Sequence, residues 1–515
     1  MNPCKRGMCG IFALIRPSIF VKTAMDAFEK GKHRGPDESI FYTLRNVWLG
    51  FHRLSINGIS NGSQPFEKNG IYLICNGEIY NHKELYAHMK KTPMTQSDCE
   101  VILDLYQEYG MEQTLHMMDA SEFSFFLYDS NKELYYSARD PYGVRPLYHA
   151  TFGDMICIAS ELKMFPDCFQ MIEPVMPSTT VCYSTNETIF YTSMPSIQHS
   201  LSMPHARIRD TLYDCVKKRV MNTEKPIACL LSGGLDSSLI ATLVNQCRKE
   251  MGITEPLETY SIGLEGGEDL KYAQIMADFL GSKHTIILVE EEDFLNAIPE
   301  VVKMIESRDT TTVRASVGNY VVAKYIKEHS EAKVVFNGDG ADEVCGGYLY
   351  MKRTPNAIEF DKECRRLVQD IHYFDALRSD RCISGNGLEA RTPFLDRAFV
   401  EMYLSIPVEL RYTQCEKQLL REAFEGYMPK EILWRKKEAF SDGVSSMNRS
   451  WFSIIQESIP EEIQQKYVDT SITLEQFYYQ TLYKQHYSAD VLPYYWMPKY
   501  TNTKDCSART LEHYS

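Results

Sequence analysis

The chain has 515 residues, a formal net charge of −14, 44% hydrophobic residues and 24% charged residues. Its length exceeds that of one compact core and predicts two or three domains. The acidic balance argues against nucleic-acid binding, because phosphate contacts need a basic surface, and no run approaches the roughly 18 apolar residues of a membrane span. The 15 cysteines show no CxxC or zinc spacing, which predicts free thiols in a reducing cytoplasm.

The first part of the chain, to about residue 191, alternates short apolar runs with Gly, Asn and Asp. Such runs predict strands and hairpins, as in "IYLICNGEIYN" at 71–81. One helix is predicted at 99–110 by "CEVILDLYQEYG". The stretch 192–207 contains two prolines and several serines, which predicts a linker. We therefore expect an antiparallel, β-rich domain over 9–191.

Beyond the predicted linker, short apolar strands alternate with amphipathic helices. The strands are expected at 226–231, 257–264, 283–288 and 332–338. This alternation predicts a parallel sheet covered by helices on both faces. From about residue 355 the pattern is mostly helical, so 208–515 is expected to be an α/β domain with a helical extension.

The turn after the first of these strands, "LLSGGLDSSLIA" at 230–241, is the strongest local signal. Its glycines allow the backbone to approach a ligand, and N–H groups at a helix N-terminus suit a phosphate. No Lys-Ser/Thr follows, as transfer of a γ-phosphoryl group would need, so a cradle for pyrophosphate leaving from the α-phosphorus fits better. Asp236 suits Mg²⁺. A plain glycine-rich turn is the alternative, but ligands bind where parallel strands end.

A second stretch rich in glycines and acids, "VFNGDGADEVCGGY" at 335–348, follows a later strand. Asp339, Asp342 and Glu343 could bind Mg²⁺, act as a base or belong to a solvated turn. The first turn resembles the pyrophosphate loop of ATP pyrophosphatases. That resemblance implies adenylation of a substrate with release of AMP and pyrophosphate.

Five motifs occur in order in the N-terminal part. They are "MCGIF" at 8–12, "HRGPDES" at 33–39, "HRLSINGISNGSQPF" at 52–66, "CNGEIYN" at 75–81 and "SDCEV" at 97–101. Together they resemble the glutaminase domain of amidotransferases that use an N-terminal cysteine. Cys9 would then be a nucleophile whose own α-amino group is the base. A small buried hydrophobe is the alternative for this residue.

The glutaminase resemblance also implies roles for the other motif residues. Asn76 and the Gly77 N–H would stabilise the oxyanion. Arg53 would bind the glutamine carboxylate, and Glu78 or Asp98 would pair with its ammonium group. A surface ion pair is the alternative for Arg53 and Asp98. The remaining predicted contacts to glutamine are Leu54, Ser55, Ile56 and Asn57.

The whole chain is similar to the glutamine-hydrolysing asparagine synthetase family. Later motifs support this, among them "GLEARTPFLD" at 387–396, "LWRKKEAFSDGV" at 433–444 and "SARTLEHY" at 507–514. The resemblance implies an αββα sandwich like that of N-terminal-nucleophile hydrolases. An α/β parallel-sheet ATP-pyrophosphatase domain, adenine nucleotide alpha hydrolase-like, would follow it. The family also suggests a homodimer.

The same resemblance assigns the synthetase residues. The ATP contacts would be Leu231, Ser232, Gly233, Gly234, Asp236, Ser237, Ile262, Asn337 and Gly338, with Mg²⁺ on Asp236 and Asp342. Thr311 and Arg314 would bind aspartate, Lys437 would stabilise the charge that builds during adenylation, and Lys436 is expected to lie on a solvated face. The chain has Asn337 and Asp339 where the best-known members have Ser and Glu, so a base at Asp339 is one methylene shorter.

The predicted function is amidation of aspartate to asparagine through β-aspartyl-AMP, with ATP and with ammonia from glutamine. A synthetase acting on another carboxylate, an ammonia-only synthetase and a non-catalytic assembly subunit are the alternatives. The proposed base requires that Cys9 become the first residue. We expect translation to start at Met8 with loss of that methionine, or cleavage of residues 1–8 as a short leader.

Overall fold

The computed structural model describes residues 9–118, 122–198, 202–438, 444–445, 449–468, 471–488, 490–495 and 499–500. The predicted leader 1–8, the C-terminal motif at 507–514, and parts of the linker and of the motif at 433–444 lie outside these residues. The chain divides by its contacts into two units. Unit 1 is Met1–Met194 with Met221–Pro226 and Ser384–Glu389, and unit 2 is the rest. The two short segments were not expected in the first unit.

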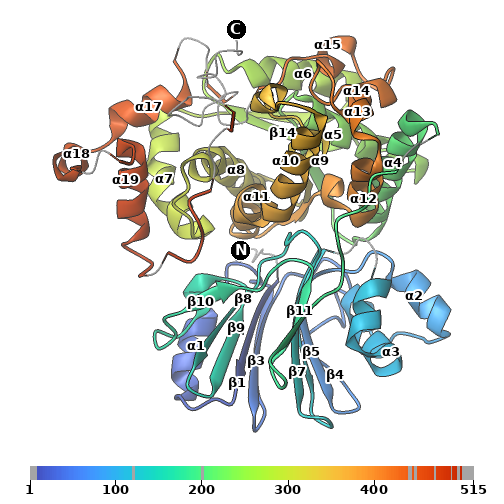
Figure 1. Ribbon diagram of the computed structural model, residues 1–515, viewed down its shortest axis with the longest axis vertical. Coiled ribbons are helices and arrows are strands. Elements are labelled where there is room, and N and C mark those ends of the chain that lie inside the picture. Colours follow the sequence, from blue (N-terminus) through green and yellow to red (C-terminus); the bar gives the residue numbers. More distant parts are fainter. Residues whose placement is uncertain are drawn as a thin grey trace. The chain divides into compact units, whose positions relative to one another are not determined.

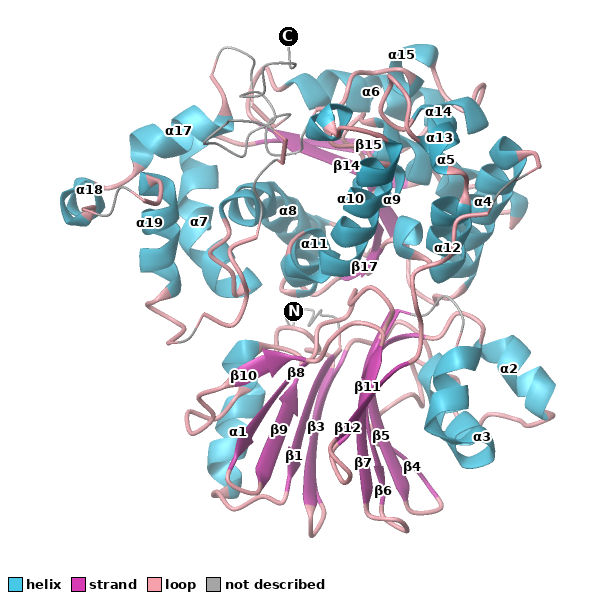
Figure 2. Ribbon diagram, in the orientation of Figure 1, coloured by secondary structure: helices cyan, strands magenta, loops and turns pink. Residues whose placement is uncertain are grey.

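Unit 1 contains two antiparallel six-stranded sheets (Figures 1 and 2). In sheet order, the first has β10 (Ile172–Pro174), β8 (Tyr148–Phe152), β9 (Met155–Ala159), β1 (Gly10–Ile15), β3 (Val47–Arg53) and β2 (Glu38–Thr43). The second has β12 (Glu187–Phe190), β11 (Thr179–Cys182), β7 (Leu134–Arg139), β6 (Glu122–Asp129), β5 (Ile71–Glu78) and β4 (Phe66–Lys68). Its helices are α1 (Val21–Glu29), α2 (His82–Met89), α3 (Val101–Met117), η1 (Asp98–Glu100) and η2 (Leu162–Met164).

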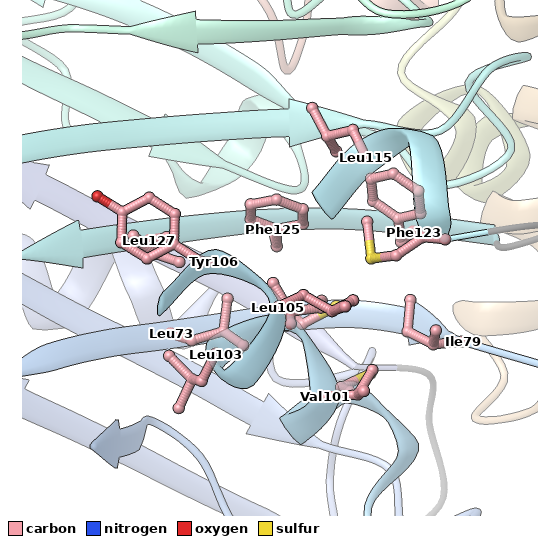
Figure 3. Packing of buried hydrophobic residues seen from close by; sticks show 14 of the residues in the cluster. Leu73, Ile79, Val101, Leu103, Leu105, Tyr106, Leu115, Phe123, Phe125 and Leu127 are labelled. Carbon is pink, nitrogen blue, oxygen red and sulfur yellow. The ribbon is translucent and has the colours of Figure 1, made fainter. Parts of the chain in front are cut away.

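The central strand β6 of the second sheet buries both of its faces. In β6, Phe123, Phe125 and Leu127 pack with side chains of α3 such as Leu105 (Figure 3). The intervening Phe126 packs instead with Ile11 and Leu49 of the first sheet. Successive strand residues point to opposite faces, so a nearly continuous apolar run produces two cores, one between the sheets and one beneath α2 and α3.

Helix α1 covers the outer face of the first sheet. Its Phe28 ring stacks on His52 of β3 at 3.7 Å between ring centroids and lies 6.1 Å from Phe12 of β1. A Cβ atom at Gly50 would lie 2.6 Å from the Phe28 ring, so glycine permits this close packing. The layers are therefore α, β, β and α, which confirms the predicted sandwich.

Unit 2 is built on a five-stranded sheet with the order β15 (Lys283–Leu288), β14 (Glu258–Gly263), β13 (Ile227–Leu230), β16 (Val334–Phe336) and β17 (Glu389–Arg391). The pairs β13–β14, β13–β16 and β14–β15 are parallel, as predicted. Parallel neighbours end at the same edge, so this topology brings the turn after β13 beside the turn after β16.

Helices surround this sheet and form the predicted helical extension (Figure 2). The helices that alternate with the strands are α4 (Pro204–Met221), α5 (Leu235–Glu250), α6 (Glu268–Leu280), α7 (Glu291–Ile305), α8 (Thr310–His329) and α9 (Ala341–Cys345). The later ones are η3 (Leu349–Arg353), α10 (Ala357–Asp370), η4 (Ile371–Tyr373), α11 (Asp375–Ser384), η5 (Pro393–Leu395), α12 (Arg397–Ser405), α13 (Val408–Arg411), α14 (Gln418–Ala423), α15 (Lys430–Leu433), α17 (Trp451–Ser458), α18 (Glu461–Lys466) and α19 (Leu474–Tyr483). None of the helices in the described part of the chain combines the length and the apolar character needed to cross a membrane.

A buried ionic cluster joins α4 to the start of α12. The Asp396 carboxylate lies 2.5 Å from the Arg219 guanidinium and 2.9 Å from the Lys218 ammonium, and it accepts a capping hydrogen bond from the Ala398 N–H. Burial alone would raise the pKa of Asp396, but the two cations outweigh burial and lower it. The ionised carboxylate therefore stabilises the fold.

We expect Asp396→Ala to lower the free energy of unfolding by about 3–5 kcal/mol, because it leaves a buried guanidinium without its partner. Because the folded pKa is depressed, the stability that Asp396 adds is present above its unfolded pKa and is lost as the pH falls toward the folded value. Urea unfolding followed by circular dichroism measures both effects. Glu401→Gln is the matched control, since its ion pair with Arg397 on α12 is partly exposed and worth less than about 1 kcal/mol.

Candidate active sites

Cys9 lies directly before β1 and beside the end of β3. Its half-buried thiol sulfur is 3.4 Å from the backbone nitrogen of Leu54, which donates to it, and 3.6 Å from the Leu54 carbonyl oxygen. The Arg34 guanidinium donates to the Cys9 carbonyl at 3.0 Å and is itself held by buried Glu161. Burial raises the pKa of the Cys9 thiol to about 12. The thiol is therefore protonated at neutral pH, and its attack on a substrate requires a nearby general base to accept the proton.

Asn76 and Gly77 lie just before the last residue of strand β5. The Asn76 side chain is completely buried, yet neither its amide nitrogen nor its oxygen has a hydrogen-bond partner among the described residues. Buried polar groups are nearly always paired, so an unpartnered amide indicates a group kept for a ligand. A Cβ atom at Gly77 would lie 2.1 Å from the Glu122 carbonyl oxygen, and its φ of 153° also favours glycine. Only glycine fits here.

Arg53, at the end of β3, is buried under the loop that follows it. Its guanidinium donates to the Gly58 carbonyl at 2.5 Å and to the Ser63 hydroxyl at 3.3 Å, and Glu38 lies 3.8 Å away. These contacts fix the guanidinium plane against the loop. Its binding to the glutamine carboxylate stays a prediction.

The two acids predicted to bind the glutamine ammonium group lie close together. The side-chain nitrogen of Asn222 donates to both carboxylates, at 2.6 Å to Glu78 and 3.3 Å to Asp98. Asn57 also donates to Glu78 at 2.6 Å, and the Ile79 N–H donates to Asp98 at 2.6 Å. The other predicted contacts form the loop after β3: Leu54 and Ile56 are buried, and the Ser55 N–H donates to Asp37.

In unit 2 the turn after β13 forms the predicted phosphate loop. Helix α5 begins at Leu235 with Gly234 as its N-cap, and the hydroxyls of Ser232 and Ser237 lie 3.0 Å apart across the turn. Gly233 has a φ of +70°, and a Cβ atom there would lie 2.3 Å from the Tyr272 backbone. A glycine is therefore required at this position.

A cavity of about 220 Å³ opens at this edge of the parallel sheet. Sequence-predicted residues that line it are Leu231, Ser232, Gly234, Asp236, Ser237, Ile262, Thr311, Asn337, Gly338, Asp339, Asp342 and Lys437. They come from the turns after β13 and β16 and the helices that follow them, from β14 and α8, and from the segment after α15, so the fold gathers residues separated by up to 206 positions along the chain. Gly233 and Arg314 are not among the lining residues.

A cluster of two carboxylates and two ammonium groups lies in this cavity. Lys417 donates to Asp236 at 2.6 Å and to Asp342 at 2.6 Å, and Lys437 donates to Asp342 at 2.5 Å. Burial alone would raise the pKa of Asp342 and lower that of Lys437, but the opposite charges outweigh it. The pKa of Asp342 is therefore lowered and that of Lys437 raised. Both Asp342 and Lys437 are therefore charged at neutral pH.

Two family models match the chain: a glutamine amidotransferase domain at residues 8–200 and asparagine synthase at residues 207–360 and 352–497. The human glutamine-hydrolysing asparagine synthetase is 39% identical over 98% of this chain and 99% of its own length. The chain belongs to the glutamine-hydrolysing asparagine synthetase family. The chicken relative is 38% identical over 98% of this chain and 99% of its own length. A solved allosteric regulatory enzyme of purine biosynthesis is also similar, at 15% identity and a TM-score of 0.32 over 54% of this chain and 80% of that one.

Asp339 is the acid that the sequence predicts as a base in the synthetase site. Its carboxylate lies at the cavity and accepts from the Arg378 guanidinium at 2.8 Å. Burial raises the pKa of Asp339, and Arg378 only partly opposes this. A carboxylate with a raised pKa is a better proton acceptor, so this setting suits the base that the sequence predicts at Asp339.

The two residues predicted to bind aspartate lie in different surroundings. Thr311 lines the cavity, and its hydroxyl has no hydrogen-bond partner among the described residues. The Arg314 guanidinium instead pairs with Glu475 of α19 at 2.7 and 2.5 Å, over the Phe452 ring. A buried guanidinium needs a carboxylate, and Glu475 provides it away from the cavity. The structure brings Thr311, but not Arg314, to the candidate site.

Asp236 and Asp342 are the residues that could hold a divalent cation. In the described part of the chain, no group of three or more His, Cys, Asp and Glu side chains is arranged as a metal site. Mg²⁺ often takes only one or two carboxylates and completes its shell with water and phosphate oxygens. The two carboxylates converge on the same Lys417 nitrogen, so they fit a cation that arrives with a polyphosphate.

Sequence reasoning missed Lys417, Arg378 and Asn222. Lys417 stands in "TQCEKQLLREA", where nothing in the local pattern separates it from a surface lysine. Its contacts join residues 181 and 75 positions apart. Only the folded chain reveals such partners.

Proposed function

We propose that this protein makes L-asparagine from L-aspartate, using ATP and ammonia released from L-glutamine. The observation that supports this proposal is that the predicted residues of both sites occur in a chain that belongs to the glutamine-hydrolysing asparagine synthetase family. One site has the Cys9 thiol and the unpartnered, buried Asn76 amide within the same unit, and the other is a charged cavity at the end of a parallel sheet. The free thiols of the described cysteines support a reducing cytoplasmic location.

The first half-reaction is hydrolysis of glutamine in unit 1. The Cys9 sulfur attacks the side-chain carbonyl carbon, the Cys9 α-amino group takes the thiol proton, and Asn76 with the Gly77 N–H binds the oxyanion. The α-ammonium group then returns this proton to the amide nitrogen, ammonia leaves, and water hydrolyses the γ-glutamyl thioester to glutamate and the free thiol. This chemistry requires removal of residues 1–8, because an amide nitrogen bonded to Met8 cannot accept the proton.

The second half-reaction is adenylation of aspartate in unit 2. The β-carboxylate of aspartate attacks the α-phosphorus of ATP, and pyrophosphate leaves into the loop at Ser232–Ser237. Lys437 and Lys417 lie where negative charge develops on the phosphates. Asp236 and Asp342 would hold Mg²⁺, which neutralises phosphate charge when it is bound. Ammonia displaces AMP from β-aspartyl-AMP, and Asp339 accepts the proton that the nitrogen loses.

The direct test is an assay of purified protein with MgATP, aspartate and either glutamine or ammonium chloride. We expect asparagine from both nitrogen sources, with AMP and pyrophosphate formed in equal amounts. Formation of ADP and phosphate would contradict adenylation. Turnover of another carboxylic acid but not of aspartate would show that aspartate is not the substrate that accepts the ammonia. Sedimentation measures whether the protein forms the homodimer that we propose by analogy with the family.

The N-terminal mass of the same preparation decides the nitrogen source. A chain that starts at Cys9 should use glutamine. A chain that retains residues 1–8 should use ammonium only, because its Cys9 has no free amine. Glutamine-dependent synthesis by a protein that keeps these residues would contradict the proposed base.

A further inference from the structure

The segment 221–226 connects α4 to β13, both of which belong to unit 2, yet its own contacts lie in unit 1. The Glu224 N–H donates to the Ile56 carbonyl at 3.2 Å, and the Glu224 carboxylate accepts from the Gly58 N–H at 3.0 Å. The loop after β3 is thereby held at two points. This loop also carries the Gly58 carbonyl that receives the Arg53 guanidinium.

Asn222 is the buried centre of this segment, with 7% of its surface exposed. Its side-chain nitrogen donates to the carboxylates of both Glu78 and Asp98. Its backbone carbonyl accepts from Asn57 at 3.2 Å, and Asn57 also donates to Glu78. Two carboxylates this close repel each other in a buried setting, and a shared amide donor offsets that repulsion and fixes their separation.

We propose that Asn222 is a positioning residue of the glutamine site: it holds Glu78 and Asp98 at the separation that the α-ammonium group of glutamine requires. This inference rests on the proposed function, because it takes these two acids as the ammonium-binding pair. The physical reason is preorganisation. A pair of carboxylates that is already in place need not be ordered when the ligand binds.

A cavity of about 580 Å³ borders both Asn57 and Asn222 in unit 1. Water can therefore reach the position that the Asn222 amide would leave in an Asn222→Ala variant. We expect this variant to fold, with the two carboxylates solvated but no longer held together. Ammonia-dependent asparagine synthesis by the variant, at the rate of the unsubstituted protein, checks that it is folded.

The test measures ligand binding in a Cys9→Ala background, which binds glutamine without hydrolysing it. Isothermal titration compares Cys9→Ala with Cys9→Ala/Asn222→Ala for two ligands, L-glutamine and glutaramic acid, which lacks the α-amino group. We expect the second substitution to weaken glutamine binding about tenfold or more, as for a lost hydrogen bond to charged groups. Binding of glutaramic acid should change less than about twofold.

Equal weakening of both ligands would overturn the proposal, because it would mean a general structural role. Unchanged glutamine binding, or no glutamine binding by Cys9→Ala, would overturn it as well. Lys225→Ala on the same segment is the matched control, since the structure gives its side chain no hydrogen bond or ion pair with a described residue. Failure of the proposed function is seen separately, as absence of asparagine when the unsubstituted protein receives ammonium.

Discussion

Replacing Cys9 by alanine should abolish glutamine-dependent asparagine synthesis and leave ammonia-dependent synthesis unchanged. We expect the first rate to fall by about 10³-fold or more, because loss of a covalent nucleophile removes the whole acyl-transfer route. The second rate should change less than about twofold, since the adenylation site lies at the parallel sheet of unit 2. Parallel assays of asparagine formation with each nitrogen source measure both effects.

Cys168→Ala is the matched control for Cys9→Ala, since Cys168 is another partly buried free cysteine of unit 1 outside the predicted motifs. It should keep both activities. If Cys9→Ala synthesised asparagine from glutamine at the original rate, Cys9 would not be the nucleophile.

The pH dependence of glutamine hydrolysis tests whether the α-amino group of Cys9 is the base that accepts the thiol proton. The pKa of the Cys9 thiol is raised to about 12, so the thiol must lose its proton to a base during attack. An α-amino group has an ordinary pKa of about 8, and it accepts a proton only when neutral. Glutamine hydrolysis should therefore increase with pH up to about 8 and then level off. A profile flat from pH 6 to 9 would contradict this base.

Replacing Lys437 by alanine should abolish asparagine synthesis from either nitrogen source and leave glutamine hydrolysis intact. Lys437 donates to Asp342 at 2.5 Å and lies 3.6 Å from Asp236. Its loss removes a charge from the position of the developing phosphate charge, which should cost about 10²–10³-fold in rate. Asparagine, pyrophosphate and glutamate are quantified in the same reaction.

Lys437→Arg and Lys362→Ala complete this experiment. The arginine variant keeps the charge and should recover part of the activity. Lys362 is an exposed lysine of α10, and its replacement should have no effect. Synthesis of asparagine by Lys437→Ala at the original rate would show that Lys437 does not act on the reacting phosphates. Because ion pairing raises its pKa, Lys437 should not titrate near neutral pH.

The sequence predicts those parts of the fold that follow from a local residue pattern, such as an apolar strand or a glycine turn. The apolar run of β6 and the glycine turn after β13 follow from local patterns, and the sheet topology then places Asp236 beside Asp342. Cys9, Asn76 and Gly77 are predicted as catalytic residues through motifs that lie within or beside strands. The structure leaves each of these residues in a setting that suits its predicted role.

The partners of buried charges could not be predicted in this way. Examples are Lys417, Arg378 and Glu475. Each pairs with a charged group that is distant in sequence but close in the fold. Burial makes such a partner necessary, but many charged residues of the chain could serve. The family resemblance assigns Arg314 to the aspartate site, whereas the structure pairs it with Glu475.

The contacts of residues 221–226 set a limit on dividing the protein into fragments. An excised glutaminase fragment that ends at the linker would contain Cys9 and every predicted glutamine contact, yet it would lack Asn222 and Glu224. It would also lack Ser384, to which Arg34 donates at 3.2 Å. A chimaera that exchanges one glutaminase module for another should therefore carry these two short insertions with it. Unit 1 consists of three separate stretches of the chain, so no single cut divides it from unit 2.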